Sequence, residues 1–426
     1  MLSISALLLA LCCLLRDVAS FKPYFSGKRY TKNILSMKNE NLIAPCVIKV
    51  IGVGGGGSNA ITRMIETGVS GVDFIAMNTD IQALAKFGPN GINIPTLNIG
   101  KEVTRGLGAG GIPDNGRKAA EESRNDIMNM IKGSDLVFVT AGMGGGTGSG
   151  AAPIVAEIAR EAGALTVGVV TKPFGFEGKR RMSQAVQAIE KLRAVVDTLI
   201  IVSNDRLLQI IPEGTPLQRA FSVADDVLRQ GVVGISEIII RPGLINVDFA
   251  DVRSIMGDAG TALMGIGRGV GKTRAQEAAA AAISSPLLDF PIEKARGVVF
   301  NVVGGQDMTL QEINAAAEVI YEAVDPNANI IFGALVDESI TSGEIAITVI
   351  ATGFPSGGAE GKEYGSGAAT IGDVDRDSIK DMPIGQVKKS FGNDDIKSTK
   401  SRPSSKQAES EDDELVNFLS KLRKRK

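Results

Sequence analysis

Apolar and polar positions repeat in one pattern from Cys46 to about Phe174. Short apolar runs rich in β-branched residues, such as CVIKVIGV, DLVFVTAG and ALTVGVVTKPF, alternate with stretches of helical periodicity, such as SNAITRMIETG and AAPIVAEIAREAG. A single helix is predicted over 116–133 in the same way. Buried apolar strands that alternate with amphipathic helices predict a parallel sheet with helices on both faces.

The pattern changes beyond residue 216. A long helix is predicted over 216–240, and the sequence Arg-Pro-Gly at 241–243 ends it. Two further apolar runs, GVVFNVVGG and EIAITVIATG, lie among helical stretches that include RAQEAAAAAI and 309–323. We therefore expect an α/β fold in which a parallel-sheet domain at 46–240, including the long central helix, is joined to a smaller α/β domain at 241–353.

Both ends of the chain depart from this pattern. Residues 354–410 lose apolar periodicity and are rich in Gly, Ser, Lys and Asp, which predicts a disordered linker. Residues 411–426 place Leu415, Phe418, Leu419 and Leu422 at helical spacing, which predicts an amphipathic peptide. A frayed, solvated tail, or a weak direct membrane contact through its basic end, are the alternatives.

The first 45 residues are typical of a targeting presequence. The apolar run Leu2–Leu15 is shorter than the about 20 residues that span a bilayer, and suits a signal peptide over about 1–20. The segment at about 21–45 begins basic and hydroxyl-rich, which is typical of a transit peptide. Two such segments in series resemble the presequences of algae with secondary plastids, so we expect the plastid stroma. A mitochondrion is the alternative, and the few cysteines give little support to secretion.

Composition removes several kinds of chemistry. The 426 residues contain no histidine and only Cys12, Cys13 and Cys46, which excludes Ser-His-Asp triads, His-ligated metals and a thiolate zinc site. A net charge of -2 and 4% aromatic residues argue against nucleic-acid binding. The remaining tools are carboxylates, amides, backbone N–H groups, Lys, Arg and an oxygen-ligated cation, and no protein metal site is predicted.

Glycine gathers in three clusters, at 52–57, 106–111 and 142–150. Loops at the carboxyl ends of parallel strands converge on one crevice, where glycine lets backbone N–H groups reach phosphate oxygens. The first cluster alone matches a dinucleotide fingerprint, which keeps an NAD-dependent oxidoreductase as an alternative. Three clusters instead favour an enclosed polyphosphate, because their density exceeds what tight turns require. The stretch at 265–273, GIGRGVGKT, has Ile266 where a phosphate-binding loop needs glycine, and is predicted to be a surface turn.

Several of these motifs resemble one family. GMGGGTGSG at 142–150 is similar to the signature loop of the tubulin/FtsZ superfamily. IGVGGGGSN, MNTD, RGLGAGG, KPFGFEGKRR, SNDRLL and INVDFADV resemble the FtsZ pattern in the same order, over about 47–353. The resemblance implies a GTP-hydrolysing, tubulin-like protein that polymerises head to tail, here into the division ring of a plastid. A filament whose GTP turnover is regulatory rather than dynamic is the alternative.

The resemblance also implies which residues bind GTP. Two loops would bind the phosphates. A third loop would sense the γ-phosphate through Ala109, Gly110 and Gly111. Glu177 and Arg181 would meet the sugar or the charged edge, although an i,i+4 surface ion pair is the alternative. The guanine would stack on Phe221 and donate hydrogen bonds to Asp225, with Asn204 beside it. The two phosphate loops comprise Gly55, Gly56, Gly57, Ser58 and Asn59, and Gly145, Gly146, Thr147 and Gly148.

One position departs from the family pattern. The family commonly has Asn-Pro-Glu after the sensor glycines, where this chain has Ile112-Pro113-Asp114. Losing the amide removes a polar contact near the phosphates, so altered nucleotide affinity or turnover is expected.

The catalytic residues implied by the resemblance are Asn246, Asp248 and Asp251. In this family their loop completes the GTP site of the next subunit, with Mg²⁺ on the phosphates. Without the resemblance, Asp248 and Asp251 would be read as helix-capping carboxylates. The expected partners are further copies of the chain, with or without a paralogous subunit, and membrane tethers or regulators that bind 411–426.

Overall fold

The computed structural model describes residues 46–88, 91–209, 211, 214–241, 243–245, 247–288, 291–337, 340 and 343–354. The predicted presequence, the linker beyond Phe354 and the amphipathic peptide at 411–426 lie outside these residues. Among the residues that the structure describes, no helix is both long enough and apolar enough to cross a bilayer.

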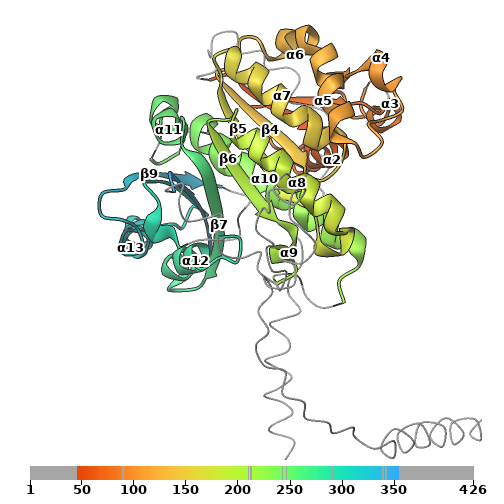
Figure 1. The fold of residues 1–426 in the computed structure, drawn as a ribbon. Coiled ribbons are helices and arrows are strands. Elements are labelled where there is room, and N and C mark those ends of the chain that lie inside the picture. The colour runs from red at the N-terminus through yellow and green to blue at the C-terminus, as the bar shows by residue number, and fades with distance from the viewer. Residues whose placement is uncertain are drawn as a thin grey trace, which may run out of the picture. The chain divides into compact units, whose positions relative to one another are not determined.

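Ten strands form one continuous sheet in the order β3-β2-β1-β4-β5-β6-β7-β10-β8-β9 (Figure 1). The first six pair in parallel, and β7 joins β6 in parallel. Their order is that of a dinucleotide-binding sheet, whose crevice lies where the chain reverses direction between β1 and β4. The parallel strands are β1 (Ile48–Val53), β2 (Asp73–Asn78), β3 (Thr96–Asn98), β4 (Leu136–Gly142), β5 (Leu165–Lys172) and β6 (Thr198–Ser203).

Helices cover both faces of this parallel sheet, as the apolar strands predicted. Buried side chains of α2 (Gly54–Glu66) and of the long α10 (Leu217–Ile240) share one core with the sheet. A second core lies on the opposite face, under α5 (Pro113–Glu122), α6 (Arg124–Ile131), α7 (Thr147–Glu161) and α8 (Lys179–Arg193). The shorter helices are α3 (Ile81–Leu84), α4 (Lys101–Thr104), α9 (Asn204–Leu207) and α11 (Phe249–Met256), with 3₁₀ turns at Gly175–Glu177 and Ile292–Lys294.

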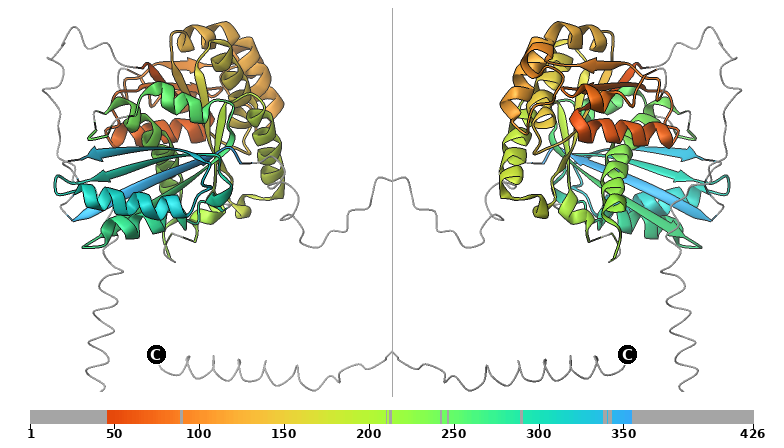
Figure 2. Two further views of the ribbon diagram at one scale, coloured as in Figure 1. Left: turned by 90° about the vertical axis from the view of Figure 1, so that its left-hand side faces the viewer. Right: turned by 90° about the vertical axis from the view of Figure 1, so that its right-hand side faces the viewer.

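The second α/β region continues the same sheet through β7 (Gly260–Val270), β8 (Gly297–Gly304), β9 (Asn329–Val336) and β10 (Glu344–Thr352). Helices α12 (Arg274–Ile283) and α13 (Leu310–Glu322) pack on one face of these strands, and α13 is seen in cyan along the blue strands in Figure 2. The expected fold class, a parallel-sheet domain joined through a long helix to a smaller α/β domain, is confirmed.

Two local predictions are wrong. The helix expected over 116–133 is two helices, because the chain turns at Ser123, whose buried hydroxyl accepts a hydrogen bond from the N–H of Gly100 at 3.0 Å. The turn expected over 265–273 is mostly strand β7. A Cβ on Gly265 or Gly267 would lie 2.1 or 2.0 Å from a carbonyl oxygen of α12, so these glycines let helix and strand pack together.

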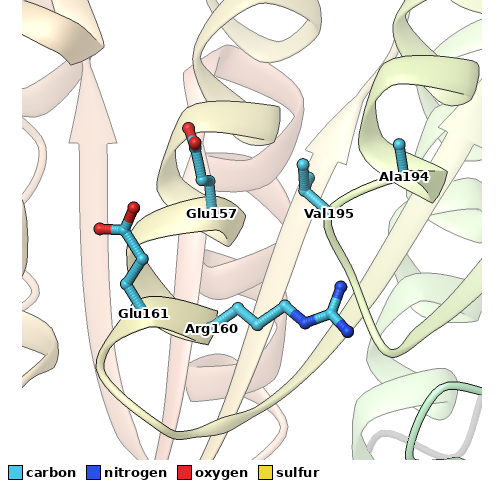
Figure 3. Close-up of a pocket in the computed structure, with 5 residues that line it drawn as sticks. All are labelled: Glu157, Arg160, Glu161, Ala194 and Val195. Carbon is cyan, nitrogen blue, oxygen red and sulfur yellow. The ribbon is translucent and has the colours of Figure 1, made fainter.

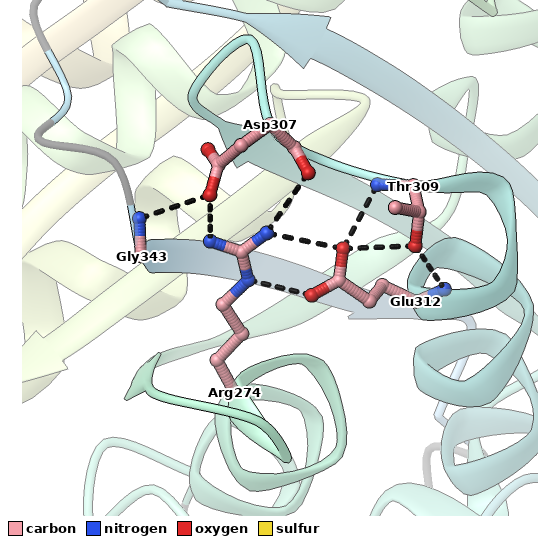
Figure 4. Close-up of polar contacts among 5 residues, drawn as sticks. All are labelled: Arg274, Asp307, Thr309, Glu312 and Gly343. Carbon is pink, nitrogen blue, oxygen red and sulfur yellow. Dashed lines mark hydrogen bonds and ion pairs between the residues drawn. The ribbon is translucent and has the colours of Figure 1, made fainter.

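One ionic cluster ties the second region together (Figure 4). The buried guanidinium of Arg274 donates to Glu312 at 2.6 Å and to Asp307 at 2.7 Å. Glu312 also accepts from Thr309 in a capping box, and Asp307 accepts from the N–H of Gly343. Hydrogen bonds from Arg274 hold the pKa of Glu312 at about 2 and lower that of Asp307. Three separate segments, at Arg274, 307–312 and Gly343, are thereby joined through groups whose hydrogen bonds are satisfied within the protein.

Candidate nucleotide-binding site

Three helix N-termini meet at the carboxyl end of the parallel sheet. Helix α2 follows β1 directly, α7 follows β4, and α5 follows the loop at 106–111. A Cβ on Gly54 would lie 3.0 Å from the N of Gly148, and one on Gly116 would lie 2.4 Å from the O of Gly146, so the three ends are in contact. Each end carries free N–H groups and a positive partial charge, and together they favour a polyanion.

The glycines of the three loops divide into two classes. At Gly57, Gly148 and Gly150 a Cβ would lie 2.4, 2.6 and 1.9 Å from a backbone oxygen, so these glycines serve backbone packing. The same crowding holds at Gly56 and Gly146, at 3.0 and 2.8 Å from a neighbouring atom. The expectation that packing does not account for the glycine density is therefore wrong for most of these positions.

At four other glycines the protein leaves space where a side chain would be. At Gly55, Gly110, Gly111 and Gly145 a Cβ would meet no atom within 4 Å. Gly110 and Gly111 also have φ of 62° and 72°, which disfavours other residues. These four leave open space around the helix N-termini, and they are the positions where an outside group can approach the backbone.

An open pocket of about 470 Å³ lies between these loops and the start of α8. Its wall includes two residues that the sequence analysis did not single out, Arg180 and Gln184. Glu177 and Arg181 also line it, but they form an ion pair at 3.0 Å, as their i,i+4 spacing allowed. Arg180 is exposed, and within the described part of the chain its guanidinium has no partner. It is therefore the cation in this pocket whose charge is available to a ligand.

The loop that carries Ala109 is held from two sides. The Asn115 amide donates to the O of Ala109 at 3.4 Å, and the N–H of the preceding Gly108 donates to the O of Thr79 at 3.2 Å. The hydroxyl of Thr79 also lies 2.6 Å from that of Thr147, at the start of α7. Ile112 occupies the N-cap of α5, where its side chain makes no capping hydrogen bond and is 47% exposed. The polar contact that an amide would supply at this position is absent.

A second group of polar residues lies on a wall formed where α10 packs against α2 and α9. The Oγ of Ser58 and the Oδ1 of Asn204 are buried and have no hydrogen-bond partner among the residues that the structure describes. Buried polar atoms without partners are rare and are commonly satisfied by a ligand or water. Phe221 is 40% exposed and packs edge-on against the buried Phe174, with ring centroids 5.4 Å apart. Of the residues expected to bind the base, Asn204 thus offers a buried acceptor and Phe221 an exposed ring.

Asp225 and Lys86 form no close ion pair within the part of the chain that the structure describes. Burial raises the pKa of Asp225 to about 6, although the charges of Arg63 and Lys86 act in the opposite direction. Lys86 donates a hydrogen bond to the Oδ1 of Asn59 at 2.8 Å. The sequence analysis missed Lys86, because a single lysine 27 residues from Asn59 carries no local signal.

The expected catalytic aspartates lie at the other end of the sheet. Asp248 is the N-cap of α11 and accepts from the N–H of Asp251 at 2.7 Å, whereas the Asp251 side chain is exposed. Arg253 in the same helix donates to the O of Gly163, just beyond the C-terminus of α7. Helix α7 begins at Thr147 and spans about 22 Å. One chain therefore does not bring Asp251 to its own glycine loops. Asn246 lies outside the described residues.

A second pocket, of about 380 Å³, lies at the far end of α7 (Figure 3). Glu157, Arg160 and Glu161 line it together with Ala194 and Val195. Arg160 pairs with Asp258 at 2.6 Å and Glu161 with Arg124 at 2.5 Å. Since these charges are already paired, this pocket lacks the unpartnered groups found at the glycine loops. Within the described residues, no three acidic or cysteine side chains are grouped to hold a metal ion.

Comparisons with known proteins agree with this geometry. Residues 47–212 match the GTPase domain of the tubulin/FtsZ family, and residues 260–355 match the C-terminal domain of the FtsZ family. The boundary expected near 241 falls between the two matches and stays a prediction.

Solved structures are similar over most of the described chain. An empty FtsZ dimer from M. jannaschii shares 45% identity, covering 72% of this chain and 88% of that chain with a TM-score of 0.68. GDP-bound monomeric CetZ1 from Haloferax volcanii is 20% identical, covering 73% and 95% with a TM-score of 0.62. CetZ2 from the same organism, as a GTPγS-bound protofilament, is 21% identical, covering 72% and 92% with a TM-score of 0.57. At that identity the two CetZ proteins support the fold alone.

Proposed function

The chain belongs to the tubulin/FtsZ family of GTPases, and from this premise we propose that it hydrolyses GTP in a head-to-tail polymer whose active sites are each completed by a neighbouring copy. The observation that carries this proposal is the separation within one chain. The phosphate-binding loops lie at one end of α7, and the exposed Asp251 lies near the other end. Figure 1 shows α11 and α9 at opposite ends of β6.

The residues at the glycine loops fit a nucleoside triphosphate. The N-termini of α2, α5 and α7 would hold the phosphates, with N–H groups exposed beside Gly110, Gly111 and Gly145. Arg180 would add positive charge at the same pocket. Mg²⁺ bound to the phosphate oxygens would neutralise charge that develops during transfer, and magnesium commonly binds through substrate phosphates with few protein ligands.

The aspartates would divide the remaining work. Asp251 has an exposed carboxylate, so it can orient a water molecule toward the γ-phosphate held by another copy. Asp248 holds the first turn of α11 through its N-cap bond and thereby fixes where Asp251 lies. Such a contact joins two different surfaces, so it does not close on itself and produces a filament. The M. jannaschii FtsZ dimer, whose chain is 45% identical to this one, supports self-association.

Mixing two defective variants of the full chain tests this split site. Asp251→Ala keeps its own pocket but offers no acid, whereas Asp225→Ala offers the acid but loses the base contact. We expect each alone to release little phosphate from GTP, and the mixture to regain activity, because one copy completes the site of the other. Asp126→Asn, on the exposed surface of α6, serves as the control and should keep normal turnover. A mixture as inactive as its components would refute the split site.

Turnover also separates dynamic from regulatory GTP use. A dynamic polymer predicts that Asp251→Ala sediments with GTP for longer than the unaltered chain, because its filaments keep their triphosphate. If sedimentation of the two chains ends at the same time, GTP binding regulates assembly without driving disassembly.

We further propose that the filament forms the division ring of a plastid, with membrane tethers or regulators bound at 411–426. The support is the sequence alone, namely the two targeting segments in 1–45 and the amphipathic spacing of Leu415, Phe418, Leu419 and Leu422. Residues 1–45 fused to a fluorescent protein should reach the plastid stroma in an algal cell. Import into mitochondria would favour the alternative location.

A further inference from the structure

We propose that Lys86 is a positioning residue of the guanine subsite, which fixes the amide of Asn59 and places a positive charge opposite the carboxylate of Asp225. This inference rests on the proposed function, since it concerns the same nucleotide. It adds a residue from the segment after α3, whereas the expected base contacts come from α9 and α10.

The contact between Lys86 and Asn59 decides which way the amide faces. The ammonium Nζ donates to the Asn59 Oδ1 at 2.8 Å. An ammonium group has only donors, so the amide must offer its oxygen to Lys86. The NH₂ group of Asn59 is then directed away from Lys86 and can donate to an acceptor on the nucleoside. Without Lys86 the amide could present either end.

The lysine is itself held in place. Its Nζ lies 5.4 Å from the centroid of the neighbouring Phe87 ring, which is buried. A cation above an aromatic ring is attracted to it, and this contact restricts the side chain. Burial lowers the pKa of Lys86, while the charge of Asp225 acts to raise it. Lys86 and Asp225 therefore interact although they do not form a close ion pair.

The state of Asp225 is what this arrangement controls. Guanine offers two neighbouring donors, N1–H and the 2-amino group, and only an ionised carboxylate accepts from both. Asp225 faces two cations, Arg63 on α2 and Lys86 after α3, and burial raises the pKa of Asp225 to about 6 despite both. Removing Lys86 should raise this pKa further, so that more of the protein meets the nucleotide with a protonated Asp225.

Calorimetric titration of the full chain with GDP across pH 5 to 8 tests the proposal. At pH 7 we expect Lys86→Gln to raise the GDP dissociation constant about tenfold, and Lys86→Arg to stay within about threefold of the unaltered chain. Lys191→Gln removes the same charge from the exposed surface of α8 and should change nothing. Asn59→Asp keeps an oxygen for Lys86 but has no NH₂ group, so it should weaken GDP binding while Lys86 remains.

Proton release distinguishes this role from a merely structural one. Titrations in buffers of different ionisation enthalpy count the protons released when GDP binds. The phosphate groups of GDP also titrate near pH 6, so Asp225→Asn supplies the baseline. The unaltered chain should release more protons than Asp225→Asn, and this difference should grow as the pH falls through about 6, where Asp225 of the free protein becomes protonated. In Lys86→Gln that difference should move to higher pH.

The outcomes separate the two proposals. A chain that binds no guanine nucleotide at all would refute the proposed function. A chain that binds GDP, but whose Lys86→Gln variant has unchanged affinity and unchanged proton release, would refute only the role of Lys86. Weaker binding that Lys86→Arg does not restore, with proton release unmoved, would also overturn it.

Discussion

Two polar clusters in this molecule differ in whether their hydrogen bonds are complete. In the Arg274 cluster the guanidinium and both carboxylates find partners within the protein, and the pKa of Glu312 falls to about 2. On the wall formed by α2, α9 and α10, Ser58 and Asn204 bury polar atoms that have no partner in the described ranges, and burial raises the pKa of Asp225 to about 6. A complete cluster stabilises the fold, whereas an incomplete one is stabilised by its ligand.

The largest expected effect tests the complete cluster. Arg274→Ala should lower the free energy of unfolding by about 3 kcal/mol, because it leaves two carboxylates without their cation. GDP affinity should not change. Arg268→Ala removes an exposed arginine paired with Glu344, and should cost less than about 0.5 kcal/mol. Denaturant unfolding of the nucleotide-free chain measures both. If Arg274→Ala reduced the free energy of GDP binding by more than it reduced the free energy of unfolding, the Arg274 cluster would not be a purely structural one.

The next effect tests the incomplete cluster. Asp225→Asn should raise the GDP dissociation constant about 100-fold, because a site built to accept guanine donors loses its acceptor. The nucleotide-free chain should be no less stable, since a buried charge is removed. Asp226→Asn is the matched control on the same helix. Asp226 bonds to Arg229 and Gln230, so its loss should slightly lower stability and leave affinity unchanged. Equal losses of affinity would argue against the base contact.

A smaller effect concerns the phosphate pocket. Arg180→Gln should weaken GTP binding about tenfold at low salt, and less at high salt, because its exposed guanidinium is screened by ions. Lys179→Gln changes the preceding, exposed residue and is the control. If both variants weaken binding alike, Arg180 acts only through the general charge of the surface.

The pH dependence of folding has opposite signs in the two clusters. The pKa of Glu312 falls from 4.5 to about 2 on folding, so its stabilisation is present above pH 4.5 and is lost as pH falls toward 2. The pKa of Asp225 rises from 3.8 to about 6, so its contribution to stability declines as pH rises through that interval. Without nucleotide, the free energy of unfolding of Glu312→Gln should fall less in acid than that of the unaltered chain. In Asp225→Asn the free energy of unfolding should no longer decline between pH 3.8 and about 6. If the free energy of unfolding depended on pH in the same way in both variants, the two clusters would not differ as described.

Much of the fold follows from local pattern. Strands such as Ile48–Val53 and Leu165–Lys172 are buried on both faces, so their sequences are almost continuously apolar and could be recognised as strands of a parallel sheet. The break at Ser123 and the strand at Gly260–Val270 were missed because each depends on a distant partner. Gly265 and Gly267 look like loop residues until α12 is seen against them.

The candidate site was predictable where residue type and spacing carry chemistry. Phe221 and Asp225 share a helix face, and the glycine loops meet at the sheet edge as parallel topology requires. Lys86 and Arg180 could not be found, because single cations are common on surfaces and only the fold reveals their surroundings. The sequence likewise did not show which glycines are needed for backbone packing and which leave open space, because both kinds occur in the same clusters.

Strand β7 has a mechanical consequence. Gly260–Ala262 pairs with β6, and from Leu263 onward the same strand pairs with β10. Strand β7 therefore joins the parallel strands to β10, and buried residues of α10 share a core with Ala262 and Met264 at this junction. Only three residues separate the end of α11 from the start of β7. A contact made at Asp251 would therefore act on the chain close to the point where β7 changes its pairing partner.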